Sequence, residues 1–270
     1  MAQFWHLLLY QPLVNALIFL YELLFHNLGL AIIVLTVVIR ALLVPLTTPS
    51  MKAAQKMKEL APEIEKLKKR YGKDKQAFAK AQMELYRQHG ANPAAGCLPQ
   101  IVQLIILIAL YQAFQKVLST DGEMITRLNE VLYSSLQLSP GTVINTHFTY
   151  LDLAKPDIFR LGGGFFGGKL PGLPGFFLLG AALVQFWSSK LMTPTVKKAQ
   201  KEAQKTPGEA DDMATAMQKQ MLYLFPLMTI LIGFTFPSGL VLYWFVFSAF
   251  TTLQQLLVNK KSRQNTVSQV

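Results

Sequence analysis

The amino-acid sequence predicts an all-α membrane protein with five transmembrane helices, a cytoplasmic helical hairpin and an N-terminal amphipathic helix at the membrane interface. Composition is the first indication, because 51% of the 270 residues are hydrophobic and only 15% are charged, whereas soluble domains carry about 25% charged residues. The second is a set of five apolar stretches long enough to cross a bilayer, each bounded by charge or by Pro and Gly. The third is that Lys and Arg are concentrated in alternate loops.

The expected segments alternate between the membrane and its two sides. In order they are an external interfacial helix (1–27), transmembrane helix 1 (28–47), a cytoplasmic helical hairpin (48–95), transmembrane helix 2 (96–118), an external loop (119–172), transmembrane helix 3 (173–192), a cytoplasmic loop (193–219), transmembrane helix 4 (220–236), transmembrane helix 5 (239–258) and a basic cytoplasmic tail (259–270). An odd number of spans places the two ends of the chain on opposite sides of the membrane.

Residues 1–27 are apolar but mixed in pattern. Polar side chains, among them Gln11, Asn15 and Glu22, interrupt the stretch, and it contains no Lys or Arg. Such a helix is typical of one that lies on the membrane surface, and a sixth span is the alternative. The start has no positively charged region and no small-residue cleavage site, so we expect no cleavable signal.

The 48–95 segment is the main soluble part of the chain. Apolar residues recur at three- and four-residue steps over about Ser50–Tyr71 and Asp74–His89, with Gly72 between the two stretches and Gly90 after the second. Two helices with one apolar stripe each and a short turn predict an antiparallel hairpin. The hairpin is either a solvated link between two spans or an element that docks on a partner.

Two loops complete the chain. The 119–172 loop ends in the Gly-rich sequence LGGGFFGGKLPG. No strand is expected before these glycines and no Gly-Lys-Ser/Thr follows them, so they do not predict a phosphate-binding loop, and we expect a flexible connection to the third span. The 193–219 segment, which contains Thr206-Pro207-Gly208, predicts a polar loop.

The distribution of Lys and Arg predicts the orientation of the chain. The 48–95 segment holds 11 of them, the 193–219 segment 5 and the 259–270 tail 3, whereas the opposite side holds 4, all in the 119–172 loop. Cytoplasmic loops carry the excess of Lys and Arg in membrane proteins. We therefore expect the N-terminus outside and the C-terminus in the cytoplasm.

Arg40 lies inside the first apolar stretch, where a charged side chain costs about 2.5–3.5 kcal/mol on insertion scales. The sequence around it, AIIVLTVVIRALLVPL, contains no carboxylate. At a rise of about 1.5 Å per residue, Arg40 falls past the middle of the membrane toward the cytoplasm. We expect it to face water or polar groups inside the protein.

Polar residues of three other spans fall in the same half of the membrane, whereas the outer halves are almost purely apolar. With one residue of the first span, the candidates to surround Arg40 are Thr36, Gln103, Gln185, Tyr243, Trp244, Ser248 and Thr252. Singly, the polar ones would serve as ordinary interhelical hydrogen bonds worth about 0.6 kcal/mol each, and the aromatic ones as packing residues. Together with Arg40 they indicate a hydrated cavity open only to the cytoplasm. Such a cavity can accept a polar stretch of polypeptide while the apolar part enters the lipid.

Four motifs resemble those of the YidC family of membrane protein insertases, which includes mitochondrial and chloroplast relatives. They are R-x-x-x-x-P-L-T at 40–47, N-P-x-x-G-C-x-P-x-x-x-Q at 92–103, A-L-Y at 109–111, and F-P-S-G-L-V-L-Y-W at 236–244 followed by Gln254 and Gln255. One such motif alone would be weak. Four in this order, together with five spans, make the resemblance specific.

The resemblance implies a bacterial plasma-membrane protein with a five-helix core and a cytoplasmic groove open to the lipid. The groove would carry its charge on Arg40 and be lined by Thr36, Gln103, Gln185, Tyr243 and Trp244. The implied partners are nascent membrane proteins and the lipid bilayer. The hairpin would be mobile and needed to receive substrate, and the C-terminal tail would help to dock ribosomes. The Sec translocon and the signal recognition particle pathway are further partners that the resemblance leaves open.

Two other functions are weighed against this one. A solute transporter or channel would need an outer vestibule with charged or broken-helix sites, and the sequence contains none. A membrane-tethered nucleic-acid or ribosome binder would use the basic hairpin. However, its 11 basic residues are accompanied by 5 acidic ones, and base-stacking aromatics are not interleaved with them. We expect no direct nucleic-acid function.

The sequence does not predict an enzyme. The four histidines, at positions 6, 26, 89 and 147, are scattered without metal-ligand spacing. The single cysteine, Cys97, excludes an intramolecular disulfide and is expected to be a small packing residue. No Ser–His–Asp set or pair of carboxylates converges on one place. We therefore expect no covalent chemistry, no bound metal and no cofactor.

Overall fold

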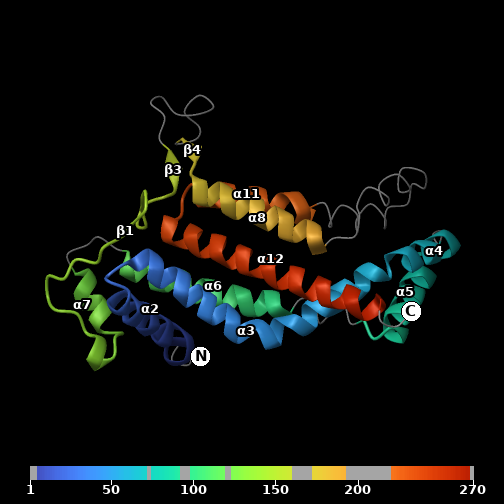
Figure 1. The fold of residues 1–270 in the computed structure, drawn as a ribbon, viewed down its shortest axis with the longest axis horizontal. Helices are drawn as coiled ribbons and strands as arrows, with labels where there is room; N and C mark the ends of the chain where they lie inside the picture. The colour runs from blue at the N-terminus through green and yellow to red at the C-terminus, as the bar shows by residue number, and fades with distance from the viewer. Residues whose placement is uncertain are drawn as a thin grey trace. The chain divides into compact units, whose positions relative to one another are not determined.

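The computed structural model describes residues 5–71, 74–91, 98–118, 123–159, 172–192 and 220–267, and these are mostly helical (Figure 1). The expected polar loop of residues 193–219 lies outside the described residues, as do the Gly-rich residues 160–171. The chain forms two compact units. The first contains Met1–Leu42, Ile101–Ala182 and Met228–Phe250, and the second contains Leu43–Gln100, Leu183–Leu227 and Thr251–Val270.

Helices account for all the predicted spans. In chain order the helical elements are η1 (His6–Tyr10), α2 (Gln11–Leu23), α3 (Leu28–Glu59), α4 (Ala61–Tyr71), α5 (Lys75–Gln88), α6 (Leu98–Val117), α7 (Met124–Asn129), η3 (Ser134–Leu136), α8 (Phe176–Met192), η4 (Gln220–Leu224), α11 (Phe225–Gly233) and α12 (Ser238–Val267). The strands, each two residues long, are β1 (His147–Phe148), β2 (Leu151–Asp152), β3 (Ile158–Phe159) and β4 (Leu173–Pro174). An all-α membrane protein is therefore the correct fold class.

Three of the described helices are long and apolar enough to cross a membrane: His6–Leu23, Leu28–Glu59 and Ser238–Lys260. Shorter apolar helices cover Ile101–Val117, Phe176–Leu191 and Leu222–Gly233. By length and composition His6–Leu23 satisfies the criterion for a span, although we expect this segment at the membrane surface. The number of five spans stays a prediction.

A tight turn separates α2 from α3. Phe25 and His26 both adopt positive φ angles, 55° and 57°, a conformation that non-glycine residues rarely adopt. The Oδ1 atom of Asn27 then accepts a hydrogen bond of 3.0 Å from the backbone N–H of Leu30. This bond caps the first turn of α3, so the break falls at the boundary expected between residues 27 and 28.

The third helix is longer than expected. We expected the first span to end near residue 47 and a separate helix to begin at about Ser50, but α3 continues without a break to Glu59, through Pro45 and Pro49. The break comes instead at Leu60, two residues before Pro62. Proline is favoured in the first turn of a helix, so Pro62 suits the start of α4 and explains the position of this break.

α4 and α5 pack side by side in the second unit (Figure 1). The helix α5 begins at a strong cap, because the Oδ1 atom of Asp74 accepts hydrogen bonds of 3.0 Å from the backbone N–H groups of Gln76 and Ala77. It ends before Gly90, whose φ of +61° is one that glycine adopts at little cost. Both ends agree with the sequence expectation for the second helix.

Close approach of helices in the first unit depends on two glycines. A methyl group at Gly233 of α11 would lie 2.2 Å from Leu178 of α8, closer than atoms can approach. At Gly180 it would lie 2.9 Å from the ring of Phe245 in α12. Small residues allow helices in membranes to pack closely, so α8 meets both α11 and α12 through glycine.

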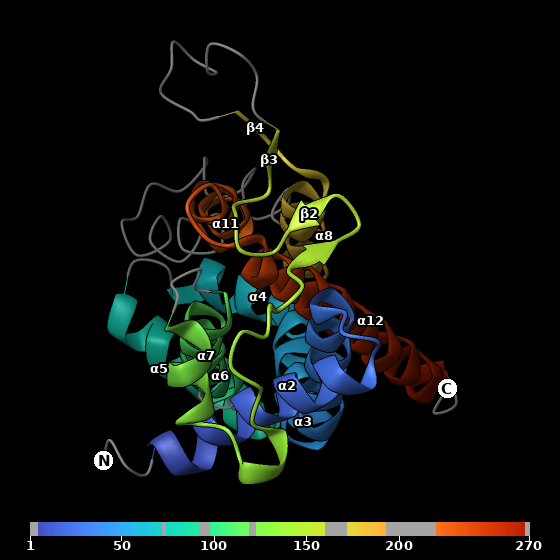
Figure 2. The same cartoon turned by 90° about the vertical axis from the view of Figure 1, so that its left-hand side faces the viewer.

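Residues 150–157 cap the starts of two helices. The carboxylate of Asp157, which is buried, accepts a 2.8 Å hydrogen bond from the N–H of Leu178 in the first turn of α8, where β3 and β4 pair (Figure 2). The carbonyls of Leu153 and Lys155 accept hydrogen bonds from the backbone N–H groups of Gly239 and Ser238 at the start of α12. Helix N-termini leave N–H groups without partners inside the helix, and this loop supplies acceptors to both.

The helix α2 packs against the chain that follows α7. Asn15 is buried, and its Nδ2 atom donates a 3.0 Å hydrogen bond to the carbonyl of Val131. Its Oδ1 atom accepts a 2.6 Å bond from the N–H of Tyr133. The hydroxyl of Tyr21 accepts from the N–H of Asn145 at 3.0 Å. These bonds fasten the N-terminal helix to the loop expected outside the membrane.

Candidate functional site

The helix α3 carries Arg40 one turn after Thr36, so both side chains lie on one face. Both are buried, with exposed fractions of 6% for Arg40 and 2% for Thr36. The Oγ1 atom of Thr36 donates to the carbonyl of Ile32 at 2.6 Å, which is the usual way a threonine satisfies its hydroxyl inside a helix. Among the described residues of the first apolar stretch, Arg40 is the one cation, and it is buried.

Two aromatic rings of α12 face the guanidinium group of Arg40. Its Cζ atom lies 4.5 Å from the centre of the Phe247 ring and 5.7 Å from that of Phe250. A desolvated cation–π contact is worth about 2 kcal/mol, against an insertion cost of about 2.5–3.5 kcal/mol for the charge. The rings therefore offset a large part of the cost of placing Arg40 in the membrane.

These two rings are not among the residues expected around Arg40 from the sequence. The stretch around Arg40 offers no partner for the charge, and the contact joins α3 to α12, which is distant in the chain. One signal was available: Tyr243, Phe247 and Phe250 are spaced by four and three residues, which places three rings on one face of α12. An aromatic stripe opposite a membrane-buried arginine indicates cation–π contacts.

The second contact of the site joins α6 to α12. The Nε2 atom of Gln103 donates a 2.5 Å hydrogen bond to the hydroxyl of Tyr243, and Tyr243 has an exposed fraction of only 2%. The ring of Tyr243 lies 6.0 Å from that of Phe247, which in turn faces the guanidinium group of Arg40. Within the first unit, Arg40, Gln103 and Tyr243 therefore belong to one connected group of side chains.

The remaining predicted residues are distributed over both units. In the first, Trp244 is partly exposed and its ring lies 6.3 Å from that of Phe236, while Ser248 is 8% exposed. Gln185 and Thr252 belong to the second unit, and both are partly exposed. The structure brings part of the predicted set together, and a groove lined by all of it stays a prediction.

A polar cluster in the second unit joins two of the sequence motifs. The Nε2 atom of Gln254 in α12 donates to the hydroxyls of Thr47 and Thr48 in α3, at 2.9 and 3.1 Å. Gln254 and Thr47 are each 6% exposed. From the sequence these residues are motif positions only, and they are not among the residues expected to line the groove.

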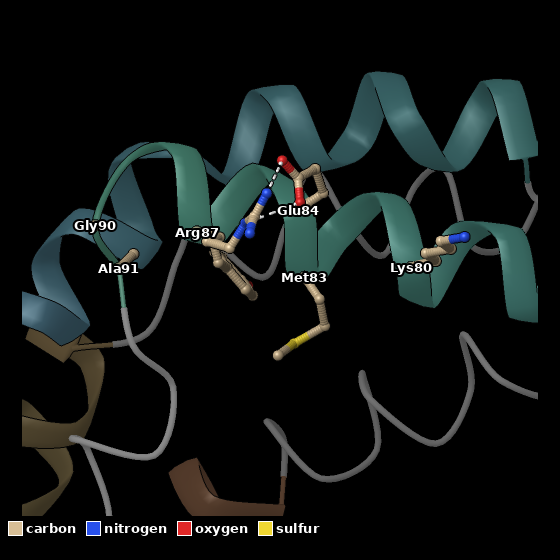
Figure 3. Close-up of a pocket in the computed structure, with 7 residues that line it drawn as sticks. Lys80, Met83, Glu84, Arg87, Gly90 and Ala91 are labelled. Atoms are coloured by element: carbon tan, nitrogen blue, oxygen red, sulfur yellow. Dashed lines mark hydrogen bonds and ion pairs between the residues drawn. The ribbon is translucent and has the colours of Figure 1, made fainter.

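The surface of α5 offers a different kind of site. A shallow depression of about 640 Å³ lies over Lys80, Met83, Glu84, Tyr86, Arg87, Gly90 and Ala91. Figure 3 shows Met83 pointing away from the α5 ribbon, while Arg87 pairs with Glu84, from Nε to Oε2 at 3.1 Å. Hydrogen bonding from Arg87 lowers the pKa of the Glu84 carboxyl. A flexible thioether beside basic side chains suits variable apolar contacts.

The arrangement around Arg40 supports binding. In the described ranges, no group of three or more His, Cys, Asp and Glu side chains could hold a metal ion. The site combines a cation, an amide and a phenol within an apolar helix bundle. These groups can donate to and accept from a polar polypeptide backbone.

Comparison with known proteins places the chain in a family. Residues 19–265 match the family described as 60Kd inner membrane protein. A protein of Fusobacterium nucleatum subsp. nucleatum named "Membrane protein insertase YidC" is 34% identical over 236 residues, which is 87% of each chain.

Two further relatives carry the same name. The protein of Pelobacter propionicus is 34% identical over 95% of this chain, and that of Wolinella succinogenes is 32% identical over 87% of it. The chain spans 39% and 34% of the lengths of these two proteins, in contrast to 87% of the Fusobacterium protein. The match over most of its residues shows that this chain, a protein of the bacterial inner membrane, belongs to the 60Kd inner membrane protein family.

Proposed function

We propose that the protein is a membrane protein insertase. It receives nascent polypeptide in a hydrophilic groove of the inner leaflet, releases hydrophobic segments into the bilayer and translocates short polar segments. The observation that carries the proposal is Arg40, a buried cation on an apolar helix whose guanidinium group faces the Phe247 ring of α12. The names of the relatives support the same function and do not favour a solute transporter or channel.

The chemistry of Arg40 suits this task. A guanidinium that lies over aromatic rings directs its N–H donors outward from its edge. A polar segment that enters beside it offers peptide carbonyls and carboxylates as acceptors. The alternative for such a segment is burial in lipid without partners, which costs several kcal/mol per polar group. The apolar flanks of the substrate need no such help and pass into the bilayer.

The proposed topology follows from the charges of the loops. The N-terminus and the 119–172 loop lie outside, and the 48–95 and 193–219 segments and the tail lie in the cytoplasm. The 1–27 segment lies at the outer membrane interface, and five helices span the bilayer. In this orientation Met83 and the basic side chains of α5 (Figure 3) are placed where a nascent chain arrives.

The proposed partners follow from the function. Nascent membrane proteins and the bilayer are the first. The Sec translocon, the ribosome and the signal recognition particle pathway are further candidates, with the basic tail, which holds Lys260, Lys261 and Arg263, as the contact to the ribosome. Insertion by this route makes no covalent bond, so the proposal involves neither an enzymatic step nor a cofactor.

Site-specific photocrosslinking tests the proposal. A photoreactive residue at position 36 or 103 should form adducts with a ribosome-stalled nascent membrane protein. The same residue in place of Val143, which is 85% exposed in the proposed external loop, should form none, and a stalled soluble domain should not react at any position. Failure at every groove position would contradict the proposal. Insertion of one reporter protein is then measured with the variants Arg40→Lys, Arg40→Gln and Arg40→Ala. Activity retained by the Gln variant would show that Arg40 acts by keeping the groove hydrated and not by its charge.

A further inference from the structure

The helix α3 contains a mechanically weak stretch between two prolines. Pro45 and Pro49 lie inside the helix, and neither has an N–H to donate to the carbonyl four residues earlier. Between them, the hydroxyl of Thr47 donates to the carbonyl of Leu43 at 2.9 Å, a bond that often accompanies bending. Helices kink at such positions unless something holds them.

Gln254 of α12 holds this stretch from the side. Its Nε2 atom donates to both Thr47 and Thr48, at 2.9 and 3.1 Å, and both acceptors lie between the two prolines. Gln254 is 6% exposed, so water does not compete strongly for its amide. Hydrogen bonds in such surroundings are costly to lose, because a buried donor is then left without a partner.

The position of this contact along the two helices means that a small change there would move the hairpin a long way. The part of α3 that lies in the second unit starts at Leu43, and that of α12 starts at Thr251. The contact therefore occurs within two turns of the point where each helix enters that unit. Beyond it α3 continues to Glu59 and leads into α4 and α5, so a small bend between the prolines would be magnified at the hairpin.

We infer that Gln254 is a positioning residue that ties the Pro45–Pro49 stretch of α3 to α12 and so sets the direction of the α4–α5 hairpin. This inference rests on the proposed function, in which the hairpin receives the substrate. The amide acts through the two threonines and does not itself contact the nascent chain. Its loss would free the bend in α3, and the hairpin would sample many directions.

Spin-label distances in lipid nanodiscs test this. Labels at Met83→Cys in α5 and Leu257→Cys in α12, both exposed and both in the second unit, are placed in a Cys97→Ala background. We expect the distribution of distances between the two labels to be narrow in the parent protein, which has Gln254, and broad in the Gln254→Leu variant. The ratio of held to released conformers should fall by about tenfold, the effect of two modest hydrogen bonds. The milder Thr48→Val, which loses only the 3.1 Å bond, should broaden the distribution less.

A triple variant separates direction from stability. With Thr47→Val, Thr48→Val and Gln254→Leu together, no buried polar group is left alone, so the melting temperature should return close to that of the parent. The distance distribution should nevertheless stay broad, because no directional bond remains. A narrow distribution in the triple variant would overturn the inference.

Gln255 provides the matched control. It is 4% exposed, and its Oε1 atom accepts no hydrogen bond from the residues that the structure describes, so Gln255→Leu should leave the distances unchanged. Equal broadening in this variant would also overturn the inference. A separate measurement of reporter insertion distinguishes failure of the proposed function from failure of this inference. A parent protein that inserts no reporter contradicts the proposed function, whereas the label distances test the role of Gln254 alone.

Discussion

The guanidinium carbon of Arg40 lies 4.5 Å from the centre of the Phe247 ring. This contact helps to explain how a permanent charge is tolerated in the apolar first part of α3. The ring face is electrically negative and needs no hydration, so it stabilises the cation without adding a second charge. A carboxylate in its place would neutralise Arg40, whereas the ring leaves the net charge of the site positive.

The contact predicts coupling between the two residues. Phe247→Leu should reduce the free energy of unfolding more in the parent than in an Arg40→Met background, and the difference should be about 1–2 kcal/mol. Denaturant unfolding in detergent measures it. Phe245→Leu is the control, because that ring packs on Phe177 of α8, and its coupling to Arg40 should be near zero. Equal coupling in both cycles would refute the cation–π account.

The bond between Gln103 and Tyr243 should also be measurable. Tyr243→Phe removes the acceptor of the Gln103 amide and should lower the free energy of unfolding by about 0.5–1.5 kcal/mol. Tyr111→Phe removes a hydroxyl that accepts from Gln115 on an exposed surface, and the change there should be near zero. A loss no larger for Tyr243→Phe than for Tyr111→Phe would show that the bond contributes nothing.

Tyr150 predicts a sensitivity to alkaline pH. Burial is the main reason that its pKa is raised from 10.0 to about 12, and its hydroxyl donates to Asp157 and accepts from the N–H of Phe176. As the pH rises, the unfolded chain loses the Tyr150 proton before the folded chain does. The stabilisation that the protonated hydroxyl gives the folded state is therefore present below pH 10 and is lost as the pH rises through about 12.

Comparison with Tyr150→Phe tests that sign. Unfolding free energies of the parent and the variant should differ most below pH 10 and should converge as the pH approaches 12. The other tyrosines are present in both proteins, so their contributions cancel in the difference between the two unfolding free energies. A difference that stays constant over this range would mean that the Tyr150 hydroxyl titrates alike in the folded and unfolded chains.

Asn15 should be among the most sensitive polar positions. Asn15→Leu leaves the N–H of Tyr133 without its acceptor, and we expect a loss of about 2–3 kcal/mol in the free energy of unfolding. Asn145→Ala, which removes an exposed bond to the N–H of His147, should cost much less. Circular dichroism during denaturation measures both, and equal losses would contradict the account of α2 docking.

The orientation of the chain can be tested in intact cells. In a Cys97→Ala background, a membrane-impermeant maleimide should label Val143→Cys from outside and should not label Met83→Cys until the membrane is permeabilised. Both positions are exposed, at 85% and 57%, so burial does not explain a difference. Labelling of Met83→Cys alone would reverse the proposed topology.

The sequence predicts where the apolar helices lie, and it draws attention to Arg40. Apolar runs bounded by Pro, Gly and charge are strong signals, and all five predicted spans are helical in the described residues. Arg40 was identified because a charge in such a run is rare. Its pairing with Phe247 was missed, because that contact depends on how distant helices pack.

Helix ends were predicted less well, and for a physical reason. Pro45 and Pro49 favour a break, yet α3 passes through both, and Gln254 of α12 bonds the two threonines that lie between them. The helix α12 also extends to Val267, beyond the expected end of the span at residue 258. Apolar length also does not distinguish a helix that crosses the membrane from one that lies on it, so His6–Leu23 satisfies both descriptions.

Residues 150–157, which cap both α8 and α12, are synthesised before either helix. A chain that emerges from the ribosome therefore carries the acceptors for both N-termini ahead of the helices that need them. The acceptors for each N-terminus are therefore already present when the first turn of that helix forms. The order of the sequence thus suits an assembly in which α8 docks first and α12 closes the bundle.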